Sequence, residues 1–153
     1  RLTQELDARD TPVVLVLFGD HKPWMGNGGS VYEEMGIDFD TSTLAGFRNY
    51  YATPYLIWAN RAAKEVLGAD FTGDGGDFSP CFLMTRLFDA CGWAGPGYMQ
   101  LSRAMRDISP LLHTNGLFLH DGVLTSVLSD TDHSFYRSWL AVQYYREHVA
   151  AYS

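Results

Sequence analysis

The first half of the chain contains two short apolar runs separated by glycine-rich and polar segments. Residues 12–18, PVVLVLF, are unbroken and rich in β-branched side chains, and residues 55–58, YLIW, follow Thr53-Pro54. Such runs are typical of strands buried on both faces of a mainly parallel sheet, and proline favours extended geometry in the residue before it. We therefore predict parallel strands at 12–18 and 54–59, within an α/β fold.

Apolar residues at helical spacing fill much of the remaining chain. We expect helices or helical turns at 1–9, 41–51, 61–67, 79–91, 97–107 and 131–150. Candidate caps are Asp40 or Thr41 for the second of these helices, Ser79-Pro80 for the fourth, and Asp130 or Thr131 for the last. The last helix places Phe135, Trp139, Val142 and Tyr145 at intervals that predict a core-facing side. Between LFLH and VLTS, Asp121-Gly122 predicts an antiparallel hairpin.

Composition narrows the class of protein. The chain has 153 residues, 46% hydrophobic and 19% charged, which is typical of a soluble globular domain. No apolar run approaches the ~20 residues that a membrane-spanning helix needs. Eleven basic residues against 18 acidic ones give a net charge of -7, which argues against nucleic acid as a partner.

We expect residues 1–153 to form one unit, with an α/β part at 1–110 followed by the hairpin and closing helix at 111–153. Cys81 and Cys91 are ten residues apart in a predicted helix, about 15 Å along its axis, so free thiols are expected. The sequence opens at Arg1 with neither a Met nor a signal segment, and we interpret it as an excerpt of a longer chain.

The most informative chemistry is Gly19-Asp20-His21, directly after the first strand. Ligands of open α/β sheets gather beyond the carboxyl ends of the strands, and carboxylate and imidazole groups both bind divalent cations. Asp20 and His21 are therefore candidate metal ligands. The alternative, evenly balanced on the residues alone, is that Asp20 caps the loop and His21 forms local hydrogen bonds.

The stretches VLFGDHKPWMG and NYYATPYLIWAN, in this order, resemble the C-terminal part of the lipoteichoic acid synthase and phosphoglycerol transferase family. That family belongs to the sulfatase and alkaline phosphatase superfamily. A looser similarity through SPCFLMTRLFDACGW extends the resemblance over roughly residues 1–110. It implies that this chain is the C-terminal portion of a sulfatase-like domain, an α/β fold with flanking helices.

The resemblance also implies a function. In this family an upstream Glu, a nucleophilic Thr and an Asp-His pair hold a divalent cation, usually Mn, with Zn or Mg as alternatives. The Thr attacks phosphatidylglycerol, and the glycerophosphoryl group passes to a glycan or lipid acceptor. Asp20 and His21 match the Asp-His pair, whereas the Glu and Thr lie before this stretch, so no catalytic residue is assigned here and the chain alone is expected to be inactive. The parent enzyme would be anchored in a bacterial cytoplasmic membrane with this domain outside it, completed by the N-terminal remainder.

Lys22 and Trp24 follow the proposed ligands closely enough to line the same cleft, Lys22 as a phosphate contact, although a solvated Lys and a packing Trp are the simpler interpretation. Two other functions stay open: hydrolysis of a sulfate or phosphate ester on the same scaffold, and a non-catalytic binding or structural module. A partial calcium-loop pattern, DFTGDG, lacks the acidic twelfth residue, because Cys81 occupies that position. The neighbouring His120 and Asp121 are attributed to the hairpin.

Overall fold

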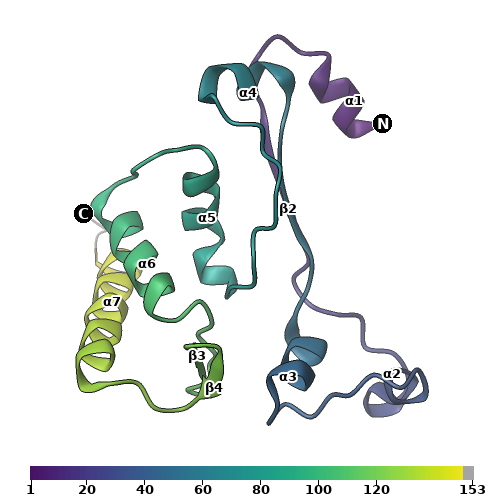
Figure 1. Cartoon of the computed structure of the whole chain (residues 1–153), viewed down its shortest axis with the longest axis vertical. Coiled ribbons are helices and arrows are strands. Elements are labelled where there is room, and N and C mark those ends of the chain that lie inside the picture. The colour runs from purple at the N-terminus through teal and green to yellow at the C-terminus, as the bar shows by residue number, and fades with distance from the viewer. Residues whose placement is uncertain (150–153) are drawn as a thin grey trace. The chain divides into compact units, whose positions relative to one another are not determined.

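Two antiparallel strand pairs organise the chain, one in each of its two compact units, Arg1–Phe71 and Thr72–Ser153. The computed structural model describes residues 1–149. Figure 1 shows the mixture of short strands and helices in both units, which agrees with the α/β content expected from the sequence. Each unit is described by itself.

In the first unit, β1 (Val14–Phe18) pairs with β2 (Tyr55–Ala59). The pairing is antiparallel, with Val14 opposite Ala59 and Phe18 opposite Tyr55, so the predicted parallel arrangement is wrong. The segment between the strands returns to the end of β1 from which it left, because the Gly19 amide donates to the Pro54 carbonyl at 3.0 Å. A parallel partner would instead need a crossover back to the start of β1.

Within the described part of the first unit, one end of the strand pair is left partly open. Leu17, Phe18 and Leu56 are 48%, 60% and 47% exposed, although the apolar pattern predicts strands covered on both faces. The opposite end is better covered, since Ala59 is buried and α4 (Arg61–Leu67) packs beside β2.

Short helices lie towards the two ends of this strand pair (Figure 1), and two of them have side-chain caps. They are α1 (Leu2–Asp7), the 3-10 turn η1 (Asn27–Gly29), α2 (Ser30–Glu34), α3 (Leu44–Tyr51) and α4 (Arg61–Leu67). The cap of α3 is Thr43, whose Oγ1 accepts a hydrogen bond from the Gly46 amide at 3.0 Å, so the predicted caps Asp40 and Thr41 are wrong. Asp40 instead accepts from the Ser42 amide and hydroxyl, and these bonds lower the pKa of its carboxyl.

The second unit packs helices around an aromatic core. Its elements are η2 (Pro80–Phe82), α5 (Leu83–Ala90), α6 (Gly97–Ile108), β3 (Phe118–His120), β4 (Val123–Thr125) and α7 (Asp130–His148). Phe82, Met105 and Trp139 are its buried centre, where α6 and α7 lie side by side (Figure 1). The indole Nε1 of Trp139 donates to the Ser102 hydroxyl at 3.0 Å, so the ring is buried with its polar atom satisfied.

The predicted hairpin is confirmed, with Asp121 and Gly122 at φ 48° and 77° between β3 and β4. Two details of α7 differ from the prediction. Ser129 rather than Asp130 or Thr131 caps it, accepting from the Asp132 amide at 3.1 Å.

Tyr145 is 55% exposed instead of core, although α7 is still beside α6 at the next residue, where the Arg146 guanidinium lies 3.9 Å from the centre of the Tyr98 ring. The expected helix at 79–91 begins as a 3-10 turn with Ser79 at its N-cap and Pro80 in its first turn, as predicted, but the Ser79 side chain forms no capping hydrogen bond. The Ser79 hydroxyl instead donates to the Leu112 carbonyl at 3.0 Å and accepts from the Leu112 amide at 2.8 Å.

Cys81 and Cys91 are both free thiols, as predicted. Within residues 1–149, none of the helices combines the length and apolar character that crossing a bilayer requires.

Candidate metal-binding loop

The candidate site is the loop that leaves β1 at Gly19. Its start is fixed from the β2 side, because the Thr53 hydroxyl donates to the Gly19 carbonyl at 2.6 Å and the Gly19 amide donates to Pro54. A Cβ on Gly19 would lie 3.0 Å from the Thr53 Cβ, so a larger residue at this position would push the two chain segments apart by a few tenths of an ångström. The Asp-His pair therefore leaves the strand from a defined point.

Asp20 and His21 lie together at the surface. The His21 Nε2 is 3.5 Å from the Asp20 Oδ2, and the imidazole and carboxylate side chains are 79% and 80% exposed. This distance is too long for a hydrogen bond between the two side chains. An ion from solvent can therefore reach both side chains, which are not hydrogen-bonded to each other.

Local hydrogen bonds orient the remaining atoms of both side chains. The His21 amide donates to the Asp20 Oδ1 at 2.8 Å, which leaves Oδ2 on the side of the imidazole. The His21 Nδ1 lies 3.0 Å from the Lys22 carbonyl, and a carbonyl only accepts, so Nδ1 carries the proton in this contact. In the neutral imidazole with this tautomer, the lone pair is on Nε2, the atom that faces Asp20.

Two anchors hold the next residues of the loop. The Lys22 ammonium donates to the Asn49 carbonyl on α3, and the Tyr32 hydroxyl of α2 donates to the Pro23 carbonyl at 2.6 Å. The Asn49 side chain in turn donates to the Asp38 carbonyl at 2.9 Å. Lys22, predicted as a phosphate contact, thus uses one ammonium hydrogen in the bond to the Asn49 carbonyl.

Trp24, the other predicted binding residue, is 64% exposed and belongs to an aromatic cluster. Its ring meets Tyr50 edge to face, with centroids 6.5 Å apart and planes at 74°. Tyr50 contacts Phe39 at 5.4 Å, and Phe39 contacts Tyr32 at 5.0 Å. Sequence reasoning missed these anchors and rings, because only folding brings residues 32–50 back to the loop.

The described residues do not supply a complete metal site. Across residues 1–149, His, Cys, Asp and Glu side chains form no group of three or more that could hold an ion. Asp20 and His21 are two ligands of the kind that Mn, Zn or Mg sites use, and a site built on them needs further ligands.

His120 and Asp121 form a second neighbouring pair, with Nε2 3.7 Å from Oδ2 and Nδ1 3.0 Å from the Ile108 carbonyl. The hydrogen bond to Ile108 raises the pKa of the His120 imidazole; partial desolvation opposes this, and the carboxylates of Asp121 and Asp132 add to the rise. A raised pKa favours the protonated ring, so a proton competes with any cation at this pair.

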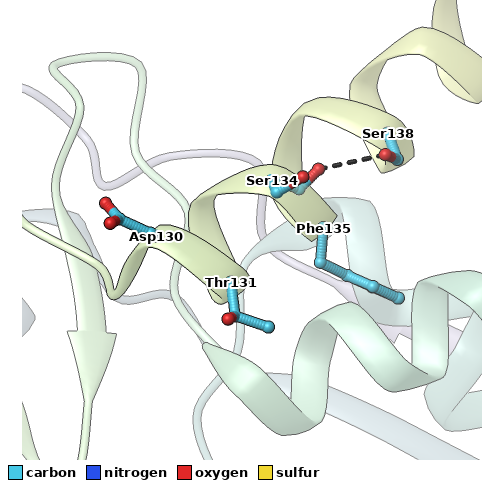
Figure 2. A pocket seen from close by; sticks show the side chains of 5 residues that line it. All are labelled: Asp130, Thr131, Ser134, Phe135 and Ser138. Atoms are coloured by element: carbon cyan, nitrogen blue, oxygen red, sulfur yellow. Dashed lines mark hydrogen bonds between the residues drawn. The ribbon is translucent and has the colours of Figure 1, made fainter.

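The second unit also has a shallow depression on α7. Figure 2 shows that its lining side chains all project from this one helix; they are Asp130, Thr131, Ser134, Phe135 and Ser138. The Ser138 hydroxyl donates to the Ser134 carbonyl at 3.0 Å, a bond within the helix. These groups include no paired nucleophile and base, so the depression offers no catalytic arrangement.

Comparison of the chain with protein-family models, with curated proteins and with solved structures gives no match.

Proposed function

We propose that this chain is part of a metal-dependent phosphoglycerol transferase, in which Asp20 and His21 are two ligands of a divalent cation, Mn in the first instance. One observation carries the proposal: Oδ2 of Asp20 and Nε2 of His21 face each other across 3.5 Å, at the surface, directly after a strand. Two donors bound at about 2.0–2.2 Å to one ion lie roughly 3.0–3.4 Å apart. The observed separation is thus close to that of two ligands sharing an ion.

The hydrogen bonds around the pair support the same role. Metal-binding histidines commonly donate their second ring N–H to a carbonyl or carboxylate, which fixes the tautomer, and the His21 Nδ1 contact with Lys22 has this form. The Asp20 Oδ1 bond to the His21 amide likewise fixes the carboxylate. A bound cation would neutralise charge on phosphate oxygens and activate a hydroxyl nucleophile.

The remaining ligands and the nucleophilic Thr are proposed to come from the segment that precedes residue 1 in enzymes of this type. The exposed apolar side chains of Leu17, Phe18 and Leu56 support this, because strands with apolar residues on both faces need cover. The proposed substrates are phosphatidylglycerol and a glycan or lipid acceptor, outside the cytoplasmic membrane. Hydrolysis of a sulfate or phosphate ester on the same scaffold is the second candidate function, since the same two metal ligands would serve that reaction.

The test is paramagnetic broadening of amide NMR signals by substoichiometric Mn²⁺, which detects binding even when two ligands hold the ion weakly. We expect broadening centred on residues 19–24 in the 153-residue chain. Asp20→Asn and His21→Gln should each remove most of it. The matched control Asp121→Asn alters the other neighbouring pair, and asparagine tolerates the positive φ of 48° at this position.

Broadening at residues 19–24 that persists in both loop variants would exclude the ligand assignment. The same conclusion would follow if Mn²⁺ broadened only signals elsewhere in the chain. Transferase and hydrolase are then separated with a longer chain that includes the preceding segment, by asking whether the glycerophosphoryl group appears on an added glycan or in water.

A further inference from the structure

Two Asn-Gly pairs occur in the chain, Asn27-Gly28 and Asn115-Gly116, and all four residues are exposed. In such a pair the backbone nitrogen of the glycine can attack the side-chain Cγ of the asparagine and close a five-membered succinimide ring. Glycine favours this attack because it has no Cβ beside the nitrogen. Whether a given pair reacts then depends on the bonds that hold the two groups in the folded protein.

The reaction needs only water. The glycine nitrogen loses its proton to solvent and bonds to Cγ, while the side-chain nitrogen takes up a proton and leaves as ammonia. Water then adds to one of the two ring carbonyls and opens the ring, which gives either Asp or isoaspartate. Both products carry a new carboxylate, and in isoaspartate the backbone runs through Cβ and Cγ and is one atom longer.

The two pairs have similar local geometry. Gly28 and Gly116 have positive φ angles of 64° and 72°, and a Cβ on either would meet nothing within 4 Å. Neither Asn27 nor Asn115 uses its side chain in a hydrogen bond to any residue between 1 and 149. Exposure, backbone conformation and the asparagine side chain therefore do not distinguish the two pairs.

Hydrogen bonding of the attacking nitrogen does distinguish them. The Gly116 amide donates to the His113 carbonyl at 2.9 Å, and the same loop is closed by the His113 amide, which donates to the Leu117 carbonyl at 2.9 Å. The Gly28 amide lies in the first turn of η1, where the helix supplies no acceptor, and among the described residues nothing else accepts from it. Of the two nitrogens, that of Gly28 can react without breaking a hydrogen bond.

We propose that Asn27 is a site of spontaneous deamidation in the folded protein, and that Asn115 is protected from the same reaction by the hydrogen bonds of its loop. The reaction uses no metal, so this inference does not depend on the proposed transferase function.

The turn that would change packs against the candidate metal-binding loop. Gly29 is buried, and a Cβ on it would lie 4.0 Å from Trp24 Cη2 and 3.8 Å from Tyr32 Cδ2. The Ser30 amide closes the turn by donating to the Asn27 carbonyl. Isoaspartate at position 27 would displace that carbonyl, because its peptide bond is made by Cγ. Deamidation should therefore alter the surroundings of the Trp24 ring.

The experiment incubates the 153-residue chain at mildly alkaline pH and follows both sites by mass spectrometry of their peptides. Asn27 should deamidate at least about threefold faster than Asn115, because a hydrogen bond must open before Gly116 can react. Isoaspartate should form together with Asp at Asn27. In urea the two rates should converge, because unfolding removes the protection of Gly116. A smaller difference in the folded chain, a faster reaction at Asn115, or Asp without isoaspartate would overturn the proposal.

Variants test the attacking nitrogen and the effect on the loop. Gly28→Ala should slow the reaction at Asn27 several-fold, whereas the matched control Gly116→Ala, which has a similar φ and equally open space, should leave it unchanged. In NMR spectra of the separated isoaspartate fraction, the indole signal of Trp24 should shift and that of Trp139, in the other unit, should not. Undiminished deamidation of Gly28→Ala would refute the proposed site, and an unshifted Trp24 signal would refute its effect on the loop.

Discussion

Asn60 is the residue whose replacement should most sharply test the account of the first unit. It is fully buried at the end of β2, and its Oδ1 accepts from the amides of Val13 and Ala63, both at 2.9 Å. Its Nδ2 carries two hydrogens, which are shared among three carbonyls of the α1–β1 connection, those of Leu6, Arg9 and Thr11 at 3.1, 3.3 and 3.0 Å. One amide therefore caps α4 and ties it to the start of β1.

Asn60→Ala removes the two bonds accepted by Oδ1 and the three contacts donated by Nδ2, about four full hydrogen bonds in total. A net contribution of roughly 0.5–1.5 kcal/mol for each bond, reduced because several partners can rehydrate, gives a loss of about 3–5 kcal/mol for this unit. Amide hydrogen exchange of the β1–β2 pair measures the opening of this unit, and protection should fall by roughly 150- to 5,000-fold. Protection within about threefold of wild type would refute the assigned role of Asn60.

Asn60→Asp separates the bonds that Oδ1 accepts from those that Nδ2 donates. It keeps the acceptor for Val13 and Ala63 but points a second carboxylate oxygen at the three carbonyls. Burial beside acceptors raises the pKa of such a carboxyl above its unfolded value near ~3.9, so the folded state binds more protons in the window above that value. Stability of this variant should therefore fall as pH rises through that window, and protection equal at pH 4 and 7 would contradict it.

Three further predictions concern the second unit. Burial alone raises the pKa of the Asp89 carboxyl, but hydrogen bonds from two arginines outweigh burial and hold it below its usual value. The stability that Asp89 contributes is thus present above its unfolded pKa and lost as pH falls. Asp89→Asn should lower the free energy of unfolding by about 2–3 kcal/mol in urea at pH 7, and it should weaken the fall of stability at acid pH. A variant whose stability falls at acid pH as steeply as that of the wild type would contradict this. Gly95→Ala places a Cβ 2.8 Å from the Phe88 ring at φ +72°, whereas Gly92→Ala, at a similar φ of +68°, meets nothing within 4 Å. Thermal unfolding should therefore show a larger loss of stability for Gly95→Ala than for Gly92→Ala. Equal losses of stability would exclude the clash. Trp139→Phe and Ser102→Ala should couple by about 1 kcal/mol in a double-mutant cycle, and additive losses would exclude their hydrogen bond.

The candidate site was predictable in part. Because a Gly-Asp-His stretch follows an apolar run, the sequence places a carboxylate and an imidazole at a strand end. It does not show that Oδ2 and Nε2 face each other, since this depends on the bonds of Oδ1 to the His21 amide and of Nδ1 to Lys22. Nor does it reveal the Asn49 and Tyr32 anchors, which come from segments brought back to the loop by folding.

The sequence by itself determined where the main elements lie and which turn joins β3 to β4, because apolar periodicity and the Asp121-Gly122 pair act through local backbone preferences. Strand direction was decided only in three dimensions. The apolar residues of β1 and β2 fit a parallel or an antiparallel neighbour equally well, and the choice was made by contacts of Gly19 with Thr53 and Pro54. The role of Asn60 was likewise decided only by the tertiary structure, because its buried side-chain amide binds backbone carbonyls about 50 residues away in the sequence.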